Sequence, residues 1–554
     1  MEENKKTKVD KTKVEKIKNK KSKKVKKIQD PKKAEKNKAI IGVIAFVALL
    51  VAAYFLTNST YKSYILPDSY KFVIYIVVVL IAWFATMLLL KSKANKLLEV
   101  LRVLFIVLLS VCLGIGAILI PEVEATIDNL QVEQPTEGTL TIDVISLIDT
   151  EFNGIADFAN NEVGVQTSLD QENQEYAINF INLEASSEML IKEYEDFETG
   201  LRALLSKEIT YLLINESYIS IMNETEEFAN FTEKIKVDYQ VTRSVAYDSI
   251  ESDVRVTESS FNVLIIGQNQ EGVEVSNNVL TDVVMVATVN PLTKQILLTS
   301  LPRDSYVDVD YSSVNDKLTH TGMRGTESVI KTVSNFLDIN IDFYLRINYN
   351  SLISIIDALG GVSVYNDYEF RGAYPYYKYT FKQGEIYLNG DMALSYARER
   401  KDTKCGDMSR NKHQRQILEA MIDRVASPTI LMQFNQVLKS LEGTYLTNIS
   451  SNQIYSLMKM QLEDLADWDL FSVGVTGGTA MRTVASASQS QQYSVVLVSQ
   501  TSLNAAKDSI ATVYNATVSS SEVENEDGEI ITEEVTEGGM TDDQESNNDL
   551  TQGC

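Results

Sequence analysis

Seven basic residues gather within residues 396–416, which read YARERKDTKCGDMSRNKHQRQ. On an extended segment, Arg398 and Arg400 would point the same way about 7 Å apart, a spacing that suits the two phosphates of a pyrophosphate. Planar guanidinium groups also bind phosphate oxygens in bidentate fashion. The cluster therefore favours an anion-binding site, and a solvated basic loop is the alternative. Its members are Arg398, Arg400, Lys401, Lys404, Arg410, Lys412 and Arg415.

Other groups with chemical potential precede this cluster. Asp282 starts a predicted strand, and Arg303 and Asp304 follow the strand expected to pair with it in a hairpin. The run 315–320, NDKLTH, adds Lys317. A carboxylate with several arginines suits an anion with two phosphates bridged by Mg²⁺, which usually takes one or two carboxylates plus substrate oxygens. The sequence contains no Walker A loop, GxSxG elbow or HExxH motif.

The charge of the chain is unevenly distributed and excludes some functions. The 554 residues carry a formal net charge of −25, although residues 1–38 alone contribute +11 through seventeen lysines and six acidic residues. An acidic body repels nucleic acid, so we expect no nucleic-acid partner. With only two histidines, the chain cannot build a three-histidine zinc site. Its three scattered cysteines do not form a disulfide framework.

Three apolar runs follow the lysine-rich start, at about 39–56, 72–90 and 103–120. Each has the length of a membrane-spanning helix. Lysines precede the first run and lie between the second and third, so the positive-inside rule predicts a cytoplasmic N-terminus and an extracellular chain beyond the third run. We expect residues 1–38 to be a disordered tail. That tail either touches anionic membrane lipid or serves only as a topology signal and solubilising segment.

The rest of the chain divides by pattern into three parts. Residues 121–260 are predicted to form an extracellular α+β accessory domain, with helices expected at 176–183 and 187–205. From 261 to 520, short strands alternate with helices, which predicts an α/β sandwich of a mixed sheet between helices. Residues 521–554 contain twelve Asp or Glu and no Lys or Arg, so they are expected to be a disordered tail.

The motifs of the third part are similar to those of the LytR-CpsA-Psr family of cell-envelope proteins. The resemblance covers about 250 residues in family order, and the three apolar runs with the accessory domain resemble the capsule-type branch of that family. The matching runs are NVLIIG (262–267), TDVVMVATVNPLTKQILLTSLPRDSYV (281–307), NDKLTHTG (315–322), IDALGGVSV (356–364), GxxxLNGxxALxYARER (384–400) and GDMSRNKHQRQ (406–416).

This resemblance implies a membrane-anchored glycopolymer–peptidoglycan phosphotransferase. Such an enzyme moves a glycan, such as capsule or teichoic acid, from undecaprenyl pyrophosphate onto peptidoglycan with Mg²⁺, and capsule-assembly membrane proteins are possible partners. Asp282 would hold the metal, while Arg303, Arg398 and Arg400 would neutralise the pyrophosphate. Asp282 or Asp304 would act as the base for the incoming hydroxyl.

The remaining candidate residues keep two readings each. Lys317 contacts phosphate or pairs with Asp316, and Arg410 and Arg415 contact pyrophosphate or orient the loop and helix. His320 is expected to be a structural histidine. A disulfide between Cys405 and Cys554 stays open. The list of pyrophosphate ligands that follows from the resemblance is Arg303, Arg398, Arg400, Lys317, Arg410, Arg415 and Gln416.

The chain departs from the family pattern at two positions. The family usually has Asp where Asn269 stands and Arg where Leu280 stands. Asn269 remains a weak candidate metal ligand, with Glu271 or Glu274 as substitutes. These departures keep a second hypothesis open, a non-catalytic binder of the polyprenyl-pyrophosphate glycolipid. A third hypothesis, a membrane-bound transcriptional regulator, conflicts with the predicted topology.

Overall fold

The computed structural model describes residues 31–541, apart from several short gaps, together with residue 544. The chain forms two compact units, residues 1–125 and 126–554. The gaps are 91–95, 131–136, 224, 226, 247–249, 269–274, 373–377, 405, 427–436, 438, 441–443 and 525–529.

The first unit consists of helices α2 (Pro31–Lys62), α3 (Asp68–Leu90) and the greater part of α4 (Lys96–Leu130). All three are long and apolar enough to cross a membrane. Small residues on their contact faces, among them Ala53 and Ala117, let the helices pack closely. Glu124 on α4 accepts hydrogen bonds from the Ser63 hydroxyl and the Tyr64 backbone, which ties α4 to the end of α2.

The prediction that residues 1–38 form a disordered tail is wrong for residues 31–38, which are helical. Residues 1–30 lie outside the described part of the chain, but α2 already begins at Pro31. Proline suits the first position of a helix because its fixed φ is helical and its missing N–H has no partner there. The helix therefore begins eight residues before the apolar run that predicted it.

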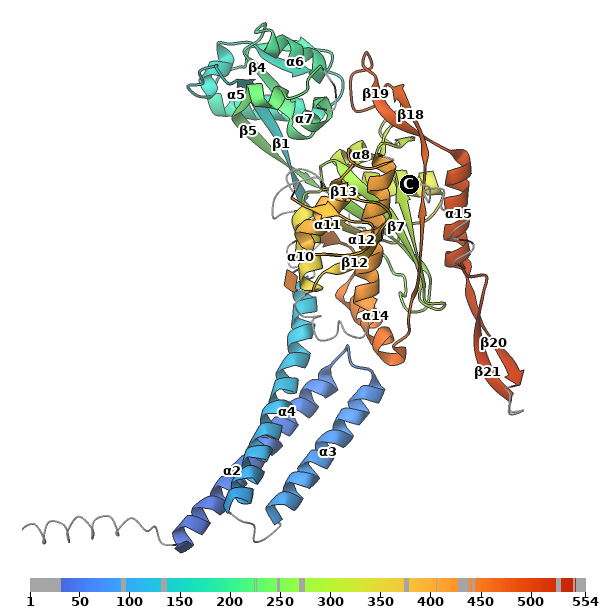
Figure 1. Cartoon of the computed structure of the whole chain (residues 1–554). Helices are drawn as coiled ribbons and strands as arrows, with labels where there is room; N and C mark the ends of the chain where they lie inside the picture. The colour runs from blue at the N-terminus through green and yellow to red at the C-terminus, as the bar shows by residue number, and fades with distance from the viewer. Residues whose placement is uncertain are drawn as a thin grey trace, which may run out of the picture. The chain divides into compact units, whose positions relative to one another are not determined.

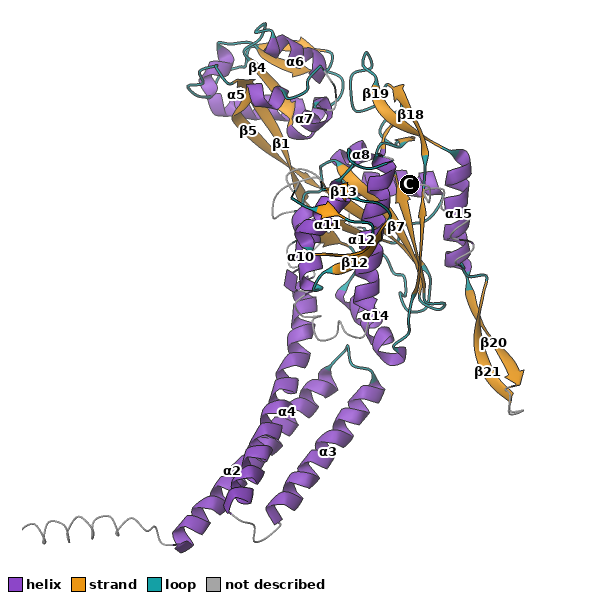
Figure 2. Cartoon of the chain, viewed as in Figure 1, coloured by secondary structure: helices purple, strands orange, loops and turns teal. Residues whose placement is uncertain are grey.

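The accessory domain is a five-stranded mixed sheet with the order β3-β2-β4-β1-β5. Its helices lie on both faces, with Ala177 and Ile181 of α5 in one hydrophobic cluster and Phe197 and Leu201 of α6 in another. The elements, seen as helices and strands in Figure 2, are β1 (Glu137–Leu147), β2 (Val163–Gln166), α5 (Gln171–Ala185), β3 (Ile191–Tyr194), α6 (Phe197–Leu205), β4 (Tyr211–Asn215), α7 (Glu216–Met222) and β5 (Ile235–Ala246).

The helix expected at 187–205 is wrong in its first half. Residues Ile191–Tyr194 form β3, which pairs in parallel with β2, and the helix α6 begins only at Phe197. The Asp196 carboxylate accepts a hydrogen bond from the backbone N–H of Thr199 and so caps the helix at this point.

The second domain has a six-stranded mixed sheet at its centre, with the order β16-β11-β6-β7-β8-β17. β7 is antiparallel to β6 and β8, whereas β11 is parallel to β6. The β7–β8 hairpin turns at Asn290, as its sequence predicts. The strands are β6 (Phe261–Gln268), β7 (Thr281–Asn290), β8 (Gln295–Leu301), β11 (Phe343–Ile347), β16 (Tyr445–Thr447) and β17 (Asp469–Gly474).

Helices cover both faces of this sheet, so the predicted α/β class is confirmed. Figure 1 shows α15 (Gln500–Asn515) and α12 (Asp407–Ala426) on opposite sides of β7. α9 (Thr326–Leu337) joins α15 in the larger hydrophobic core. On the other side, α12 packs on the sheet and also on α10 (Tyr349–Ala358) and α11 (Gly390–Arg398).

The accessory domain and the second domain share one hydrophobic cluster. Phe197 and Tyr218 of the accessory domain lie in the same buried cluster as Met323 and Tyr493. Glu198, which is only 2% exposed, accepts hydrogen bonds from the Tyr493 hydroxyl and the Ser488 backbone. The domain boundary predicted at residue 260 therefore separates two domains that share a hydrophobic cluster.

The expectation of a disordered tail from residue 521 onward is also wrong in part. Strands β20 (Thr517–Glu524) and β21 (Ile530–Glu537) pair as an antiparallel hairpin, which extends beyond α15 in Figure 1. The chain then returns to the body, where Met540 is buried in the large core. The Gln295 side chain both donates to and accepts from the Met540 backbone, so the hairpin is anchored at its far end.

Gly361 offers a first test of the fold. It has φ +85°, and an added Cβ would lie 2.2 Å from the Tyr387 hydroxyl oxygen. We expect Gly361→Ala to cost about 1–3 kcal/mol of stability, because both strain and overlap oppose it. The measurement is the thermal unfolding midpoint of the full chain in detergent. Gly478→Ala is the control, since a Cβ there meets nothing within 4 Å. Equal midpoints for the two variants would contradict the expectation.

Candidate active site

The elements that carry the predicted site residues converge at one edge of the six-stranded sheet. β6, β8 and β11 all run toward this edge, and antiparallel β7 starts there. Arg303 therefore follows the end of β8 beside Asp282 at the start of β7. Tyr349 follows the end of β11. Ligand sites of open α/β sheets commonly lie at the carboxyl ends of parallel strands.

A cavity of about 610 Å³ opens at this edge. Part of its wall is apolar and comes from strands β6, β7 and β11 and from helices α10, α11 and α12. The apolar lining residues are Ile265, Val283, Met285, Ile347, Leu352, Leu394, Ala397, Ile417, Leu418 and Met421. Three neighbouring apolar side chains of α12, Ile417, Leu418 and Met421, thus face the cavity. Another part of the wall is charged, with Asp282, Arg303, Arg371, Arg398, Glu399, Arg400, Lys401, Asp402 and Arg410.

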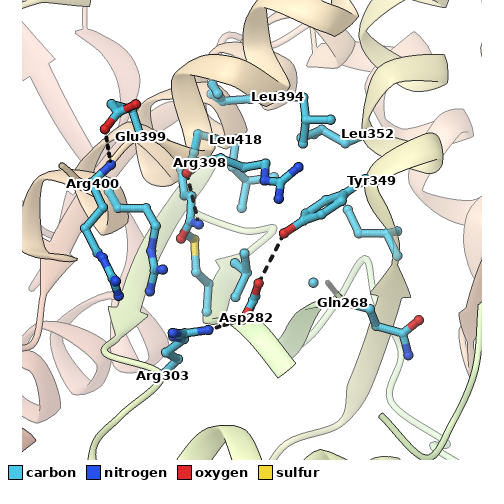
Figure 3. Close-up of a pocket in the computed structure, with 18 of the residues that line it drawn as sticks. Gln268, Asp282, Arg303, Tyr349, Leu352, Leu394, Arg398, Glu399, Arg400 and Leu418 are labelled. Carbon is cyan, nitrogen blue, oxygen red and sulfur yellow. Dashed lines mark hydrogen bonds and ion pairs between the residues drawn. The ribbon is translucent and has the colours of Figure 1, made fainter. Parts of the chain in front are cut away.

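Asp282 is held between two donors. Arg303 Nη1 donates to Oδ1 at 2.5 Å, and the Tyr349 hydroxyl donates to Oδ2 at 3.1 Å (Figure 3). The pair Asp282–Arg303 is mostly buried, so solvent screens it little. Burial and the charge of Asp282 raise the pKa of Tyr349, so its hydroxyl stays protonated and acts as a donor.

Arg398 does not lie on an extended segment, so the expected pairing of Arg398 and Arg400 along a strand is wrong. Arg398 is the last residue of α11, and its guanidinium carbon lies 4.7 Å from the centroid of the Tyr349 ring. Asn389 caps this helix at its start by accepting from the Met392 backbone. Both arginines nevertheless line the cavity.

The loop that carries Arg400 is folded around Glu399. One oxygen of this buried carboxylate accepts the backbone N–H groups of Arg400, Lys401 and Asp402 at 2.6–2.9 Å. Asp402 in turn accepts the backbone N–H of Arg371. A single carboxylate therefore determines the course of the loop that brings the arginine to the cavity.

The guanidinium groups repel one another in this site. Burial lowers the pKa of Arg410, and the charges of Arg303 and Arg400 lower it further, while Asp407 and Asp282 oppose this effect. Three arginines held this closely in a partly buried site favour the binding of an anion, which removes part of the repulsion.

Three predicted pyrophosphate ligands do not line the cavity. Lys317 is 4% exposed, and its Nζ lies 3.6 Å from Asp304 rather than beside Asp316. Arg415 is buried and donates to the Ser300 hydroxyl on β8, which braces α12 against the sheet.

Gln416 is the third of these residues. It donates to the Tyr365 carbonyl and accepts from the Tyr396 hydroxyl. In all three cases the side chain contacts a polar group that lies elsewhere in the fold instead of lining the cavity.

His320 is a structural histidine, as predicted from the sequence. Its Nδ1 lies 2.6 Å from Asp316 Oδ1, and neither side chain is exposed. Asp316 also accepts from the Lys317 backbone and from the Tyr311 and Ser486 hydroxyls. This buried network lies outside the lining of the cavity.

Tyr349 and Arg371 are among the residues of the cavity wall that the sequence analysis did not single out. Tyr349 had a signal, because it opens a helix directly after a strand and behind the capping residue Asn348. The capping box, in which Asn348 and Ser351 exchange hydrogen bonds, defines this position. Arg371 had no comparable signal.

The two departures from the family pattern fall in different places. Asn269, with Glu271 and Glu274, lies outside the described residues, as do Cys405 and Cys554. Leu280 packs against the cluster shared with the accessory domain, so its side chain serves that interface.

Among the described residues, no group of three or more His, Cys, Asp or Glu could hold a metal ion. A single carboxylate still fits Mg²⁺ when phosphate oxygens supply other ligands. Arg303 donates to one oxygen of Asp282 and Tyr349 donates to the other, and a carboxylate offers about four lone-pair sites. The donor set therefore fits a magnesium ion that is shared with a substrate.

The model of the LytR_cpsA_psr family matches residues 218–512, which is more than half of the chain. This chain belongs to the LytR-CpsA-Psr family. The match begins inside the accessory domain, at α7, rather than at residue 261.

Curated members of the family with similar sequences are named polyisoprenyl-teichoic acid–peptidoglycan teichoic acid transferase TagU. The protein of Halalkalibacterium halodurans is 35% identical over 242 residues, which cover 43% of this chain and 75% of that protein. The protein of Bacillus licheniformis is 32% identical over 198 residues, which cover 36% of this chain. The chain spans 62% of the length of that relative, less than two thirds.

Solved structures of family members also resemble part of the chain. The crystal structure of B. subtilis TagV is 26% identical with a TM-score of 0.38, and the match covers 46% of this chain and 96% of TagV.

Proposed function

We propose that this LytR-CpsA-Psr protein transfers a glycopolymer from a polyprenyl-pyrophosphate carrier, such as undecaprenyl pyrophosphate, to a hydroxyl of peptidoglycan. The product is a phosphodiester between glycan and wall, and the carrier leaves as a prenyl monophosphate. Teichoic acid is one candidate polymer, in line with the names of the relatives, and capsular polysaccharide is the other.

The observation that carries this proposal is the composition of one cavity. It joins an apolar wall, including Leu352, Leu394 and Leu418, to a cluster of arginines around Asp282 (Figure 3). An apolar wall suits a prenyl chain, and guanidinium groups suit the pyrophosphate to which that chain is attached. Few ligand classes combine these two properties.

The charged wall can perform the transfer chemistry. The arginines of the cavity wall would stabilise charge on the transferring phosphoryl group and on the departing lipid phosphate; they are Arg303, Arg398, Arg400 and Arg410. Asp282 lines the cavity and is paired directly with Arg303. Asp304 does not line it, because its carboxylate lies beside Lys317 and Arg303. Asp282 is therefore favoured over Asp304 as the carboxylate of the reaction.

A magnesium ion would be held by Asp282 together with phosphate oxygens of the substrate. It would supply charge neutralisation at the pyrophosphate. The arginines bind and orient the same group, so substrate binding does not depend on the metal alone.

We further propose that the cavity lies outside the cell. The lysine-rich residues 1–38 and the basic residues between the second and third apolar helices favour a cytoplasmic N-terminus by the positive-inside rule. Three helices then place the domains after α4 on the opposite side, where peptidoglycan lies.

The test uses the full chain in detergent with a short-chain polyprenyl-pyrophosphate oligosaccharide and soluble peptidoglycan fragments. We expect transferred product and prenyl monophosphate, more of both with Mg²⁺ than with a chelator, and loss of both in Asp282→Ala. Arg255→Ala is the control, because this exposed arginine pairs locally with Glu258.

Tight binding of the glycolipid without release of prenyl monophosphate, even with acceptor and Mg²⁺ present, would refute the transferase. That result would support the non-catalytic carrier-binding function instead, for which the absence of an aspartate at Asn269 is the motivating observation.

A further inference from the structure

One side chain in the cavity touches both kinds of charged group that the transfer needs. The Tyr349 hydroxyl donates to Asp282 Oδ2 at 3.1 Å, and the Tyr349 ring lies under the Arg398 guanidinium at 4.7 Å. Asp282 comes from the start of β7 and Arg398 from the end of α11, 116 positions later in the sequence. Figure 3 shows Tyr349 between them.

We propose that Tyr349 is the positioning residue of this site, holding Asp282 through its hydroxyl and Arg398 through its ring. This inference rests on the proposed transfer function. It assigns one supporting residue to both the carboxylate of Asp282 and the guanidinium of Arg398. Tyr349 itself does not take part in the bond-making steps.

The geometry at Asp282 explains why the hydroxyl matters. Arg303 holds one carboxylate oxygen, and a single hydrogen bond leaves the carboxylate able to turn about its last torsion, which is broad for aspartate. The second bond from Tyr349 removes this freedom. A carboxylate held at both oxygens is oriented before the substrate arrives, which avoids reorganisation during the reaction.

The ring has a separate effect on Arg398. A guanidinium over an aromatic face is attracted by the ring quadrupole, and the attraction grows where water is excluded. Arg398 ends its helix, so its backbone position alone does not determine where the guanidinium lies. Leucine at position 349 would keep an apolar surface without this attraction.

The position of Tyr349 is itself well defined. It is the first residue of α10, immediately after the capping residue Asn348, whose side chain accepts from the Ser351 backbone and hydroxyl. The helix is anchored in the core by Ile355 and Ile356. A side chain projecting from such a start into the cavity is supported by rigid elements.

Two substitutions separate the two contacts. Tyr349→Phe removes the hydroxyl and keeps the ring, whereas Tyr349→Leu removes both. The matched control is Tyr387→Phe, because Tyr387 is exposed, lies outside the cavity lining and donates its hydroxyl to the Gly360 carbonyl. The measurements on the full chain are kcat and KM of transfer, Kd for farnesyl pyrophosphate, and the unfolding midpoint.

Tyr349→Phe is expected to lower kcat about 10- to 100-fold, the size of a lost hydrogen bond to a charged group, with Kd and midpoint close to wild type. Tyr349→Leu is expected to lower kcat at least as much and to weaken farnesyl pyrophosphate binding about 5- to 10-fold. In the background of Asp282→Asn, Tyr349→Phe should have no further effect, since residues that act as a unit are non-additive.

A wild-type kcat in Tyr349→Phe would overturn the proposal. So would a full additional loss in the Asp282→Asn background, or a lowered midpoint that parallels the lost activity. If the wild-type chain transfers nothing, the proposed function fails by itself. The positioning role of Tyr349 is then decided by the binding of farnesyl pyrophosphate. Weaker binding in Tyr349→Leu but not in Tyr349→Phe supports it, and wild-type binding in both variants overturns it.

Discussion

Arg303→Ala is expected to slow glycopolymer transfer about 100- to 1,000-fold, the usual effect of removing one preorganised charge-stabilising donor. The variant loses a guanidinium of the arginine cluster and also the 2.5 Å contact that holds Asp282 Oδ1. Arg303→Lys should recover only part of the loss, because an ammonium group cannot reproduce the bidentate fork. The measurement is the rate of prenyl monophosphate release under the conditions that test the function.

The loss of one positive charge from the protein would not by itself slow transfer in this way. Arg255→Ala removes the same charge from an exposed position and should transfer at nearly the wild-type rate. If Arg303→Ala retained more than a tenth of wild-type activity, the arginine cluster would not be the site of transfer.

Asp316→Ala is expected to lower the stability of the protein by about 3–5 kcal/mol, because it removes the shared acceptor of a fully buried polar network. Its carboxylate is unexposed and accepts hydrogen bonds from Tyr311, Ser486 and the Lys317 backbone in addition to the His320 contact. Removing it leaves these groups buried without their acceptor. Urea unfolding of the full chain measures the change, and Asp508→Ala on the surface of α15 is the control.

The contribution of Asp316 to the stability of the protein is expected to decrease at low pH. Burial alone would raise the pKa of Asp316, but the charge of His320 and the hydrogen bonds outweigh it, so the pKa lies below its ordinary value. A carboxyl with a lowered folded-state pKa stabilises the protein above its unfolded pKa of about 3.9, and the contribution is lost as pH falls further. The stability gap between wild type and Asp316→Ala should therefore narrow below about pH 4. A gap that widened there would contradict this account.

The sequence predicted the elements of the second domain well because their local signals agree with the final structure. The Asn290 turn joins two β-rich runs and forms a hairpin, and the strand-helix alternation from 261 to 425 appears as expected. Asp282 and Arg303 were predicted to meet because hairpin pairing is local in sequence. In the structure, Arg303 Nη1 lies 2.5 Å from Asp282 Oδ1.

Predictions failed where distant groups decide a side chain's position. The family resemblance makes Arg415 and Gln416 candidate ligands, but their side chains donate to the Ser300 hydroxyl and the Tyr365 carbonyl and do not line the cavity. Arg398 reaches the cavity from a helix end rather than a strand. In the accessory domain, pairing with β2 overrode the helical appearance of residues 187–205.

By itself, the sequence determined the three apolar helices, the α/β class, the family resemblance and the two residues Asp282 and Arg303 at the centre of the candidate site. These depend on length, periodicity and neighbours in the chain. Only the tertiary structure decided that the accessory domain shares a core with the second domain, and that Tyr349 joins Asp282 to Arg398. Both are contacts between residues far apart in sequence, and no local pattern specifies which distant surfaces will meet.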